Sequence, residues 1–196
     1  MNSRVFGRRA LWAVLILSLI GFGLSVESYR EIKRTASGEP TWCSFGSFAD
    51  CEKAFRSSYS KLWGRPTSLY GSVTYLFLAW IAMLGLKKGG PFALASLFHL
   101  GLLSFPLIGV TCYLAWASFI QLKILCPICV AIYLINMAIV GLVWWTCWQI
   151  APPYDSIIRW DIRTLFGDFR RTTWTVLVVA LIIALIILLG SMDSVN

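Results

Sequence analysis

The chain has 196 residues, of which 58% are hydrophobic and only 13% are charged, and its formal net charge is +8. A soluble domain of this length could not bury so much apolar side chain, so the composition excludes a soluble globular protein and indicates an integral membrane protein. In a membrane protein a positive net charge reflects topology and contact with anionic lipid, so we expect a lipid bilayer and no nucleic acid as partner.

The first predicted membrane helix covers residues 10–26 and follows an arginine-rich start. Basic residues before an apolar run are also typical of a cleaved signal peptide. This run is longer than the usual apolar core of a signal peptide, and residues 23–25 are the nearest approach to a cleavage site of small residues. We therefore expect a retained membrane helix.

A polar segment, residues 27–67, follows and is expected to form an extracytoplasmic loop with Cys43 and Cys51. Asp50 is a typical N-cap residue, so a short helix is predicted with Cys51 in its first turn. A helix start stabilises a thiolate, which makes Cys51 a candidate reactive thiol. The aromatic residues of the segment suit the bilayer interface and are interpreted as anchors: Trp42, Phe45, Phe48, Phe55, Tyr59 and Trp63.

Two further membrane helices are predicted over residues 68–86 and 92–120, with a basic, glycine-rich turn between them. The third helix contains His99, the only histidine of the chain. We interpret it as a packing residue, because a metal site would need further ligands. A short connection, residues 121–125, leads to the fourth predicted helix.

That fourth helix, residues 126–149, opens with a C-x-x-C motif formed by Cys126 and Cys129. Pro127 suits the first helical position, where its missing N–H costs no hydrogen bond. Cys126 then lies at the cap, and Cys129 lies about one turn deeper on the same side. The partial positive charge of a helix start makes Cys126 the expected better nucleophile. A dithiol at the lip of a membrane helix indicates redox chemistry.

The remaining sequence predicts a cytoplasmic loop over residues 151–172 and a fifth membrane helix over residues 173–190. Cys112 and Cys147 lie inside apolar runs and are interpreted as small hydrophobic residues. With the N-terminus in the cytoplasm, the inner segments carry nine basic residues and the outer segments eight. The count discriminates little, but the basic flank of the first helix favours this orientation. This orientation places Cys43, Cys51, Cys126 and Cys129 in one oxidising, extracytoplasmic compartment.

The order of these motifs along the chain resembles that of the bacterial vitamin K epoxide reductase family over about residues 10–150. The resemblance rests on Cys43 and Cys51 separated by seven residues, Phe55-Arg56-Ser57-Ser58, Thr67-Ser68-Leu69-Tyr70-Gly71, and Cys126-Pro127-Ile128-Cys129 with Tyr133. It implies an all-α membrane protein of the bacterial inner membrane. Four transmembrane helices would surround a quinone, either ubiquinone or menaquinone, and the fifth helix would be additional.

The same resemblance implies roles for individual residues. The loop cysteines would pass electrons to the C-x-x-C, where Cys126 exchanges with the loop and Cys129 faces the quinone. Ser57 and Tyr133 would lie near the polar end of the quinone, and Thr67, which stands where vertebrate members have asparagine, is a third candidate contact. Many bacterial members carry a thioredoxin-like domain after the fifth helix. This sequence ends at Asn196, so a separate thioredoxin-fold dithiol protein is the expected partner.

The residues support this chemistry independently, because Cys129 and Tyr133 are four apart and share one helix face. A thiolate and a phenol donor would then face the same quinone. The expected activity is quinone-dependent oxidation of dithiols in support of disulfide formation. The alternative is a membrane protein without redox activity that uses its cysteines in a structural metal or disulfide site, although the wide spacing of Cys43 and Cys51 is unusual for zinc.

Overall fold

The computed structural model describes residues 3–44, 50–62 and 64–150. Within this part lie four long helices: α1 (Ser3–Ala36), α3 (Thr67–Lys88), α4 (Pro91–Trp116) and α5 (Pro127–Ile150). Between α1 and α3 come the short helix α2 (Cys51–Arg56), the 3-10 turn η1 (Ser58–Ser60) and a hairpin of β1 (Lys61–Leu62) and β2 (Arg65–Pro66). A π-helical turn, η2 (Ala117–Gln121), extends α4. The predicted loop at residues 151–172 and the fifth helix lie outside the described residues.

Each long helix is long and apolar enough to cross a membrane. Large apolar side chains also point outward from the bundle, among them Leu134 at 66% exposure and Trp148 at 85%. So much exposed apolar surface is typical of contact with lipid. The all-α membrane bundle predicted from the sequence is therefore confirmed.

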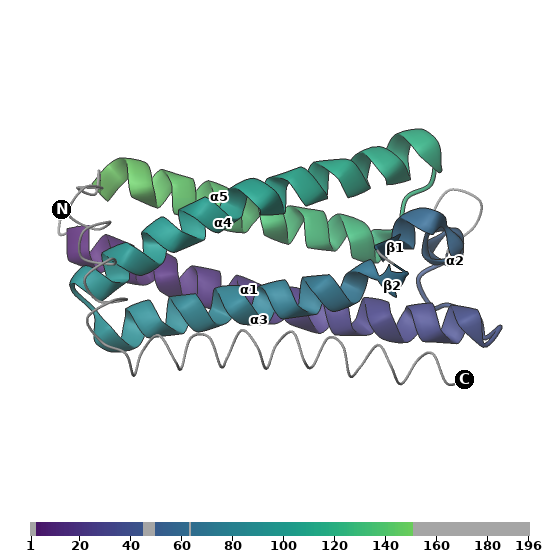
Figure 1. The fold of residues 1–196 in the computed structure, drawn as a ribbon, viewed down its shortest axis with the longest axis horizontal. Helices are drawn as coiled ribbons and strands as arrows, with labels where there is room; N and C mark the ends of the chain where they lie inside the picture. Colours follow the sequence, from purple (N-terminus) through teal and green to yellow (C-terminus); the bar gives the residue numbers. More distant parts are fainter. Residues whose placement is uncertain (1–2, 45–49, 63, 151–196) are drawn as a thin grey trace. The chain divides into compact units, whose positions relative to one another are not determined.

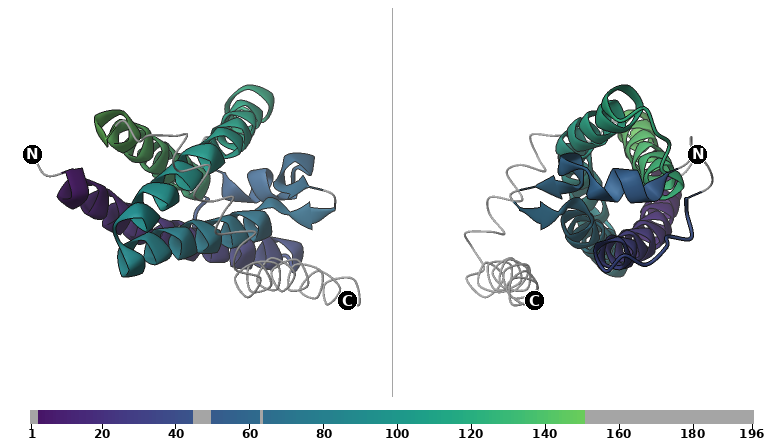
Figure 2. Two further views of the ribbon diagram at one scale, coloured as in Figure 1. Left: turned by 60° about the vertical axis from the view of Figure 1, so that its left-hand side comes forward. Right: turned by 90° about the vertical axis from the view of Figure 1, so that its right-hand side faces the viewer.

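Successive long helices run in opposite directions (Figure 1). The end of α1, the start of α3, the end of α4 and the start of α5 consequently meet at one end of the bundle. Helix α2 and the hairpin lie across this same end, as the two further views in Figure 2 also show. We call it the α2 end.

All four long helices contribute to one apolar core. Its fully buried members include Leu11 of α1, Leu78 of α3, Leu100 of α4 and Ile139 of α5. Helices α1 and α3 pack closely where Gly21 faces the ring of Tyr75, because a Cβ on Gly21 would lie 2.5 Å from that ring.

Helix α1 differs from its predicted form, because it ends at Ala36 rather than at residue 26. The added turns carry two ion pairs at i,i+3 spacing, Glu27 with Arg30 and Glu31 with Arg34, which stabilise a helix. One face of these turns is also buried, including Glu31. The charged sequence of these turns predicts a loop. Their burial depends on contacts with residues distant in the sequence, which the local pattern does not reveal.

The interpretation of the aromatic residues as interface anchors is wrong for Phe55, which is only 6% exposed and packs with the cysteines of the loop. Tyr59 makes edge-to-face contacts with Tyr113 and Trp116 of α4. Trp42 is 53% exposed. The other three predicted anchors, residues 45, 48 and 63, lie outside the described residues.

Candidate active site

The loop cysteines, Cys43 and Cys51, form a disulfide. Cys51 is the first residue of α2, and Asp50 caps that helix by accepting a hydrogen bond from the backbone N–H of Lys53 at 2.9 Å, as predicted. The hydroxyl of Ser44 reinforces this start, because it accepts from the backbone N–H of Glu52. The cap therefore fixes the position of Cys51, whereas Cys43 lies in a turn outside any helix.

The C-x-x-C motif is placed by the connection after η2. Lys123 has a left-handed backbone conformation, with φ 52°, which ends the helical run and redirects the chain. Ile124 is then buried, and α5 begins at Pro127 as predicted. The sulfur of Cys126 accepts the backbone N–H of Cys129 at 3.4 Å, so this cysteine is the side-chain cap of α5.

This position alters the acidity of Cys126. A hydrogen bond from the Cys129 side chain, aided by the backbone N–H groups of Cys129 and Ile128, holds the pKa of Cys126 below its ordinary value, although burial acts in the opposite direction. A lower pKa means that more thiolate is present at neutral pH, and the thiolate is the nucleophile in disulfide exchange. Of the two thiols of the motif, Cys126 is therefore the one whose surroundings favour the thiolate.

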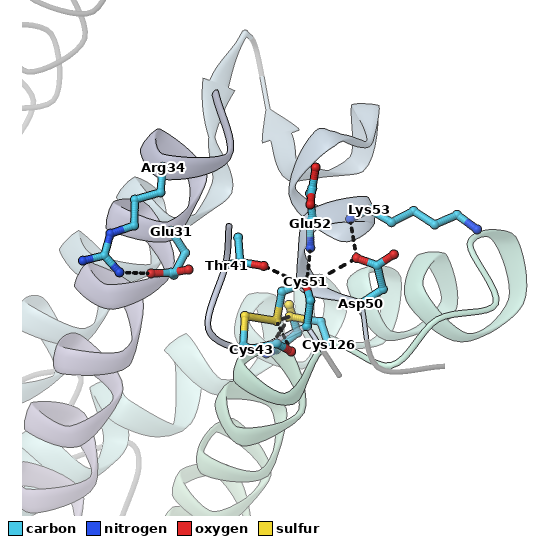
Figure 3. Close-up of a disulfide and its surroundings, with 11 residues drawn as sticks. Glu31, Arg34, Thr41, Cys43, Asp50, Cys51, Glu52, Lys53 and Cys126 are labelled. Carbon is cyan, nitrogen blue, oxygen red and sulfur yellow. Dashed lines mark hydrogen bonds and ion pairs between the residues drawn. A yellow bond between two sulfur atoms is a disulfide. The ribbon is translucent and has the colours of Figure 1, made fainter. Parts of the chain in front are cut away.

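The loop disulfide and Cys126 meet at the α2 end (Figure 3). The sulfur of Cys51 lies 3.5 Å from the sulfur of Cys126 and 3.3 Å from the carbonyl oxygen of Cys43. Cys43 and Cys51 are fully buried and Cys126 is 1% exposed, in an apolar cluster completed by Phe55, Ile124 and other side chains. The loop disulfide and the first thiol of the C-x-x-C are thus in direct contact, shielded from water.

The three candidate quinone contacts are distributed over different elements. Tyr133 of α5 is half-buried, and its hydroxyl lies 3.4 Å from that of Ser118 in η2. Ser57 instead donates to the carbonyl of Ala54 at 2.6 Å and ends α2. Thr67 is the half-buried first residue of α3. No hydrogen bond among the described residues joins Ser57, Thr67 and Tyr133 to one another.

A second polar contact lies deeper in the bundle and was missed by the sequence analysis. Tyr75 donates to Asn136 at 2.6 Å, and Asn136 donates to Thr111 at 2.8 Å. Asn136 is seven residues after Cys129, so it lies on the same face of α5 as Cys129 and Tyr133. A buried amide in an apolar membrane helix was the signal that could have revealed it.

The other cysteines lie apart from this cluster. Cys112 is exposed on α4, and Cys147 is half-buried with its sulfur near the carbonyl of Leu97. Among the residues that the structure describes, no group of three or more His, Cys, Asp and Glu side chains is arranged to hold a metal ion.

The geometry of two contacting cysteine pairs within a four-helix membrane bundle agrees with the comparison with protein families. The model of the vitamin K epoxide reductase family matches residues 12–144. The chain belongs to the vitamin K epoxide reductase family. Such family members are membrane thiol oxidoreductases linked to quinones, and the matched range contains both cysteine pairs. A search of curated proteins returns no match.

Proposed function

We propose that this family member oxidises a separate, extracytoplasmic thioredoxin-fold dithiol protein and passes the electrons to a membrane quinone, ubiquinone or menaquinone. The observation that carries the proposal is the 3.5 Å contact between the sulfurs of Cys51 and Cys126. A structural disulfide needs no activated thiol against one of its sulfurs, whereas an exchange relay requires one.

The relay begins when a thiolate of the partner attacks the sulfur of Cys43. A partner–Cys43 bond forms, the Cys43–Cys51 bond breaks, and Cys51 leaves as a thiolate. The second partner thiol then releases the oxidised partner and leaves Cys43 as a thiol. Two electrons have passed from the partner to the loop pair.

The electrons then pass to the C-x-x-C motif in its disulfide form. The Cys51 thiolate attacks Cys126, so that a Cys51–Cys126 bond forms and Cys129 leaves. Cys43 next attacks Cys51, which restores the loop disulfide and releases Cys126. The products of this exchange are a loop disulfide and a C-x-x-C dithiol, which is the arrangement of the structure.

A quinone is the chemically suitable final acceptor. A strongly oxidising thioredoxin-fold protein has a reduction potential near about −120 mV, so an acceptor of still higher potential must keep it oxidised. The residues on one face of α5 fit such a group. Cys129 would supply the thiolate, while the hydroxyls of Tyr133 and Ser118 would hold a quinone oxygen. Thr67 and Ser57 remain candidates for its other contacts.

The test is quinone reduction by the purified chain in detergent, driven by a reduced thioredoxin-fold protein and followed by quinone absorbance. We expect turnover that is abolished by Cys126→Ser. The control is a double variant, Cys112→Ala with Cys147→Ala, which removes the two cysteines outside the cluster and is expected to retain turnover. Absence of quinone reduction by the wild-type chain, with dithiols left unoxidised, would favour a structural role for the disulfide.

A further inference from the structure

Cys43 differs from the other three cysteines because it does not lie at the start of a described helix. Cys51 begins α2, Cys126 caps α5, and Cys129 lies in the first turn of α5. Cys43 lies in a turn and is fully buried. Yet in the proposed relay it must lose a proton before it can attack Cys51, and its burial restricts proton transfer to bulk solvent.

The carboxylates near Cys43 are not equally able to accept that proton. Asp50 is occupied by the N–H of Lys53 and lies within 3.5 Å of the hydroxyl of Ser44. Glu52 is 43% exposed and paired with Arg56 at 2.9 Å. Each of these groups has a structural role at α2.

Glu31 of α1 is the exception. Its side chain is fully buried, one oxygen accepts from Arg34 at 2.7 Å, and the other oxygen, Oε2, is buried with no hydrogen-bond partner. A buried carboxylate oxygen without a partner is costly, so its presence calls for a functional reason. Thr35, one turn further along the same face of α1, carries another buried hydroxyl without a partner.

The carboxylate also lies on the correct side of α1. Figure 3 shows it on the side that faces Thr41 and the Cys43–Cys51 disulfide. The next residue, Ile32, packs against the cysteine cluster itself. In this view the buried carboxylate and the sulfur that has to be deprotonated lie on the same side of α1.

We propose that Glu31 accepts the proton of Cys43 in the step that closes the loop disulfide, an inference that rests on the proposed relay. The electron pair of the Cys43 S–H bond forms the Cys43–Cys51 bond. The electron pair of the Cys51–Cys126 bond leaves with Cys126, whose position as the cap of α5 stabilises the thiolate. The proton goes to Oε2 of Glu31. Because Arg34 is half-exposed, the proton can leave to solvent on that side.

The pH profile of a Glu31 variant also depends on the charged and titratable groups of α1 and of the elements at the α2 end. Helix α1 contributes Glu27, Arg30, Lys33 and Arg34; the loop and α2 contribute Glu39, Asp50, Glu52, Lys53 and Arg56; the hairpin contributes Lys61 and Arg65; and the start of α5 with its connection contributes Lys123, Cys126 and Cys129. A substitution at Glu31 must therefore be compared with substitutions among these groups.

The chain offers a matched control on the same helix. Glu27 and Arg30 form an ion pair with the same i,i+3 spacing one turn earlier, but there both side chains reach solvent. Glu27→Gln therefore removes a similar pair without removing a buried acceptor. Arg34→Gln removes the partner of Glu31 but retains its carboxylate.

The experiment follows a single oxidation of the fully reduced, full-length chain in detergent by a short-chain ubiquinone. Reactions are run at several pH values between 6 and 9. Samples taken at intervals are quenched with acid, alkylated, and mapped by mass spectrometry. For Glu31→Gln we expect the Cys126–Cys129 bond to form at the wild-type rate. Closure of Cys43–Cys51 should slow by about tenfold or more at pH 7, since a positioned proton acceptor typically contributes about 10²–10⁴-fold and buffer replaces it in part.

In Glu31→Gln the Cys51–Cys126 bond should also accumulate before closure, and the deficit should shrink towards pH 9 as hydroxide replaces the carboxylate. Glu31→Asp should recover part of the rate, and Glu27→Gln should behave as wild type. Closure at the wild-type rate in Glu31→Gln, or an equal deficit in Arg34→Gln, would overturn the inference. Should quinone fail to oxidise the wild-type chain, the proposed function fails, and the same comparison is started with oxidised glutathione.

Discussion

At the scale of single residues, each cysteine owes its chemistry to its backbone position. The same residue type is a helix cap at Cys126, held in a disulfide at Cys51, and exposed on α4 at Cys112. Sequence spacing predicted the cap, because proline after a cysteine marks the first helical residue. It could not predict that Ser118 would lie beside Tyr133, because that contact depends on the π-helical turn after α4.

Tyr133→Phe tests the role of this phenol. If its hydroxyl stabilises a quinone oxygen, the change should slow quinone reduction by about 10²-fold, the loss typical of one such donor. Exchange between the loop pair and the C-x-x-C should be unaffected. Both rates can be read from quenched-flow peptide mapping, with Tyr113→Phe on the exposed face of α4 as control. An equal loss of both rates would point to a defect in folding instead.

At the scale of elements, the helix ends explain where sequence analysis succeeded. The boundaries of α3, α4 and α5 were predicted closely, because glycine, proline and the C-x-x-C mark them. The end of α1 was not, because its last turns are charged and their burial depends on contacts with residues distant in the sequence. For the same reason the sequence analysis missed Glu31, which reads locally as a solvated ion-pair residue.

The packing of α1 on α3 can be tested at Gly21. Gly21→Ala places a methyl group against the ring of Tyr75, and the shift of that ring should disturb its hydrogen bond to Asn136. We expect a destabilisation of about 1–3 kcal/mol, as is usual for overpacking. Thermal unfolding in detergent, followed by tryptophan fluorescence, measures it. Gly23→Ala is the matched control, since its Cβ would meet no atom within 4 Å; comparable midpoints for the two variants would refute the packing argument.

At the scale of the whole molecule, the proposed orientation places the α2 end outside the cytoplasm. The buried cysteines are poor reporters, so the test uses exposed positions in a chain without its native cysteines. Trp42 lies at the α2 end and Lys88, the last residue of α3, lies at the opposite end, so the two variants are Trp42→Cys and Lys88→Cys. A membrane-impermeant maleimide should label the first in intact cells and the second only after lysis. The reverse pattern would place the redox cluster in the cytoplasm.

The order of the relay also belongs to the scale of the whole molecule, because it depends on how α2 packs against the start of α5. The sulfur of Cys51 is the one that contacts Cys126, and Cys129 lies in the first turn of α5, where the proposed quinone would meet it. Cys51 should therefore exchange with Cys126, leaving Cys43 to the external partner.

Two double variants separate these roles. Cys43→Ser with Cys129→Ser leaves Cys51 to pair with Cys126, and Cys51→Ser with Cys129→Ser leaves Cys43 as the alternative. Under a mild oxidant the first variant should form its disulfide at least about tenfold faster, because the reacting sulfurs are already in contact. Non-reducing peptide mapping over time measures both rates. Faster formation of Cys43–Cys126 would mean that the two loop cysteines exchange roles, with Cys51 meeting the partner.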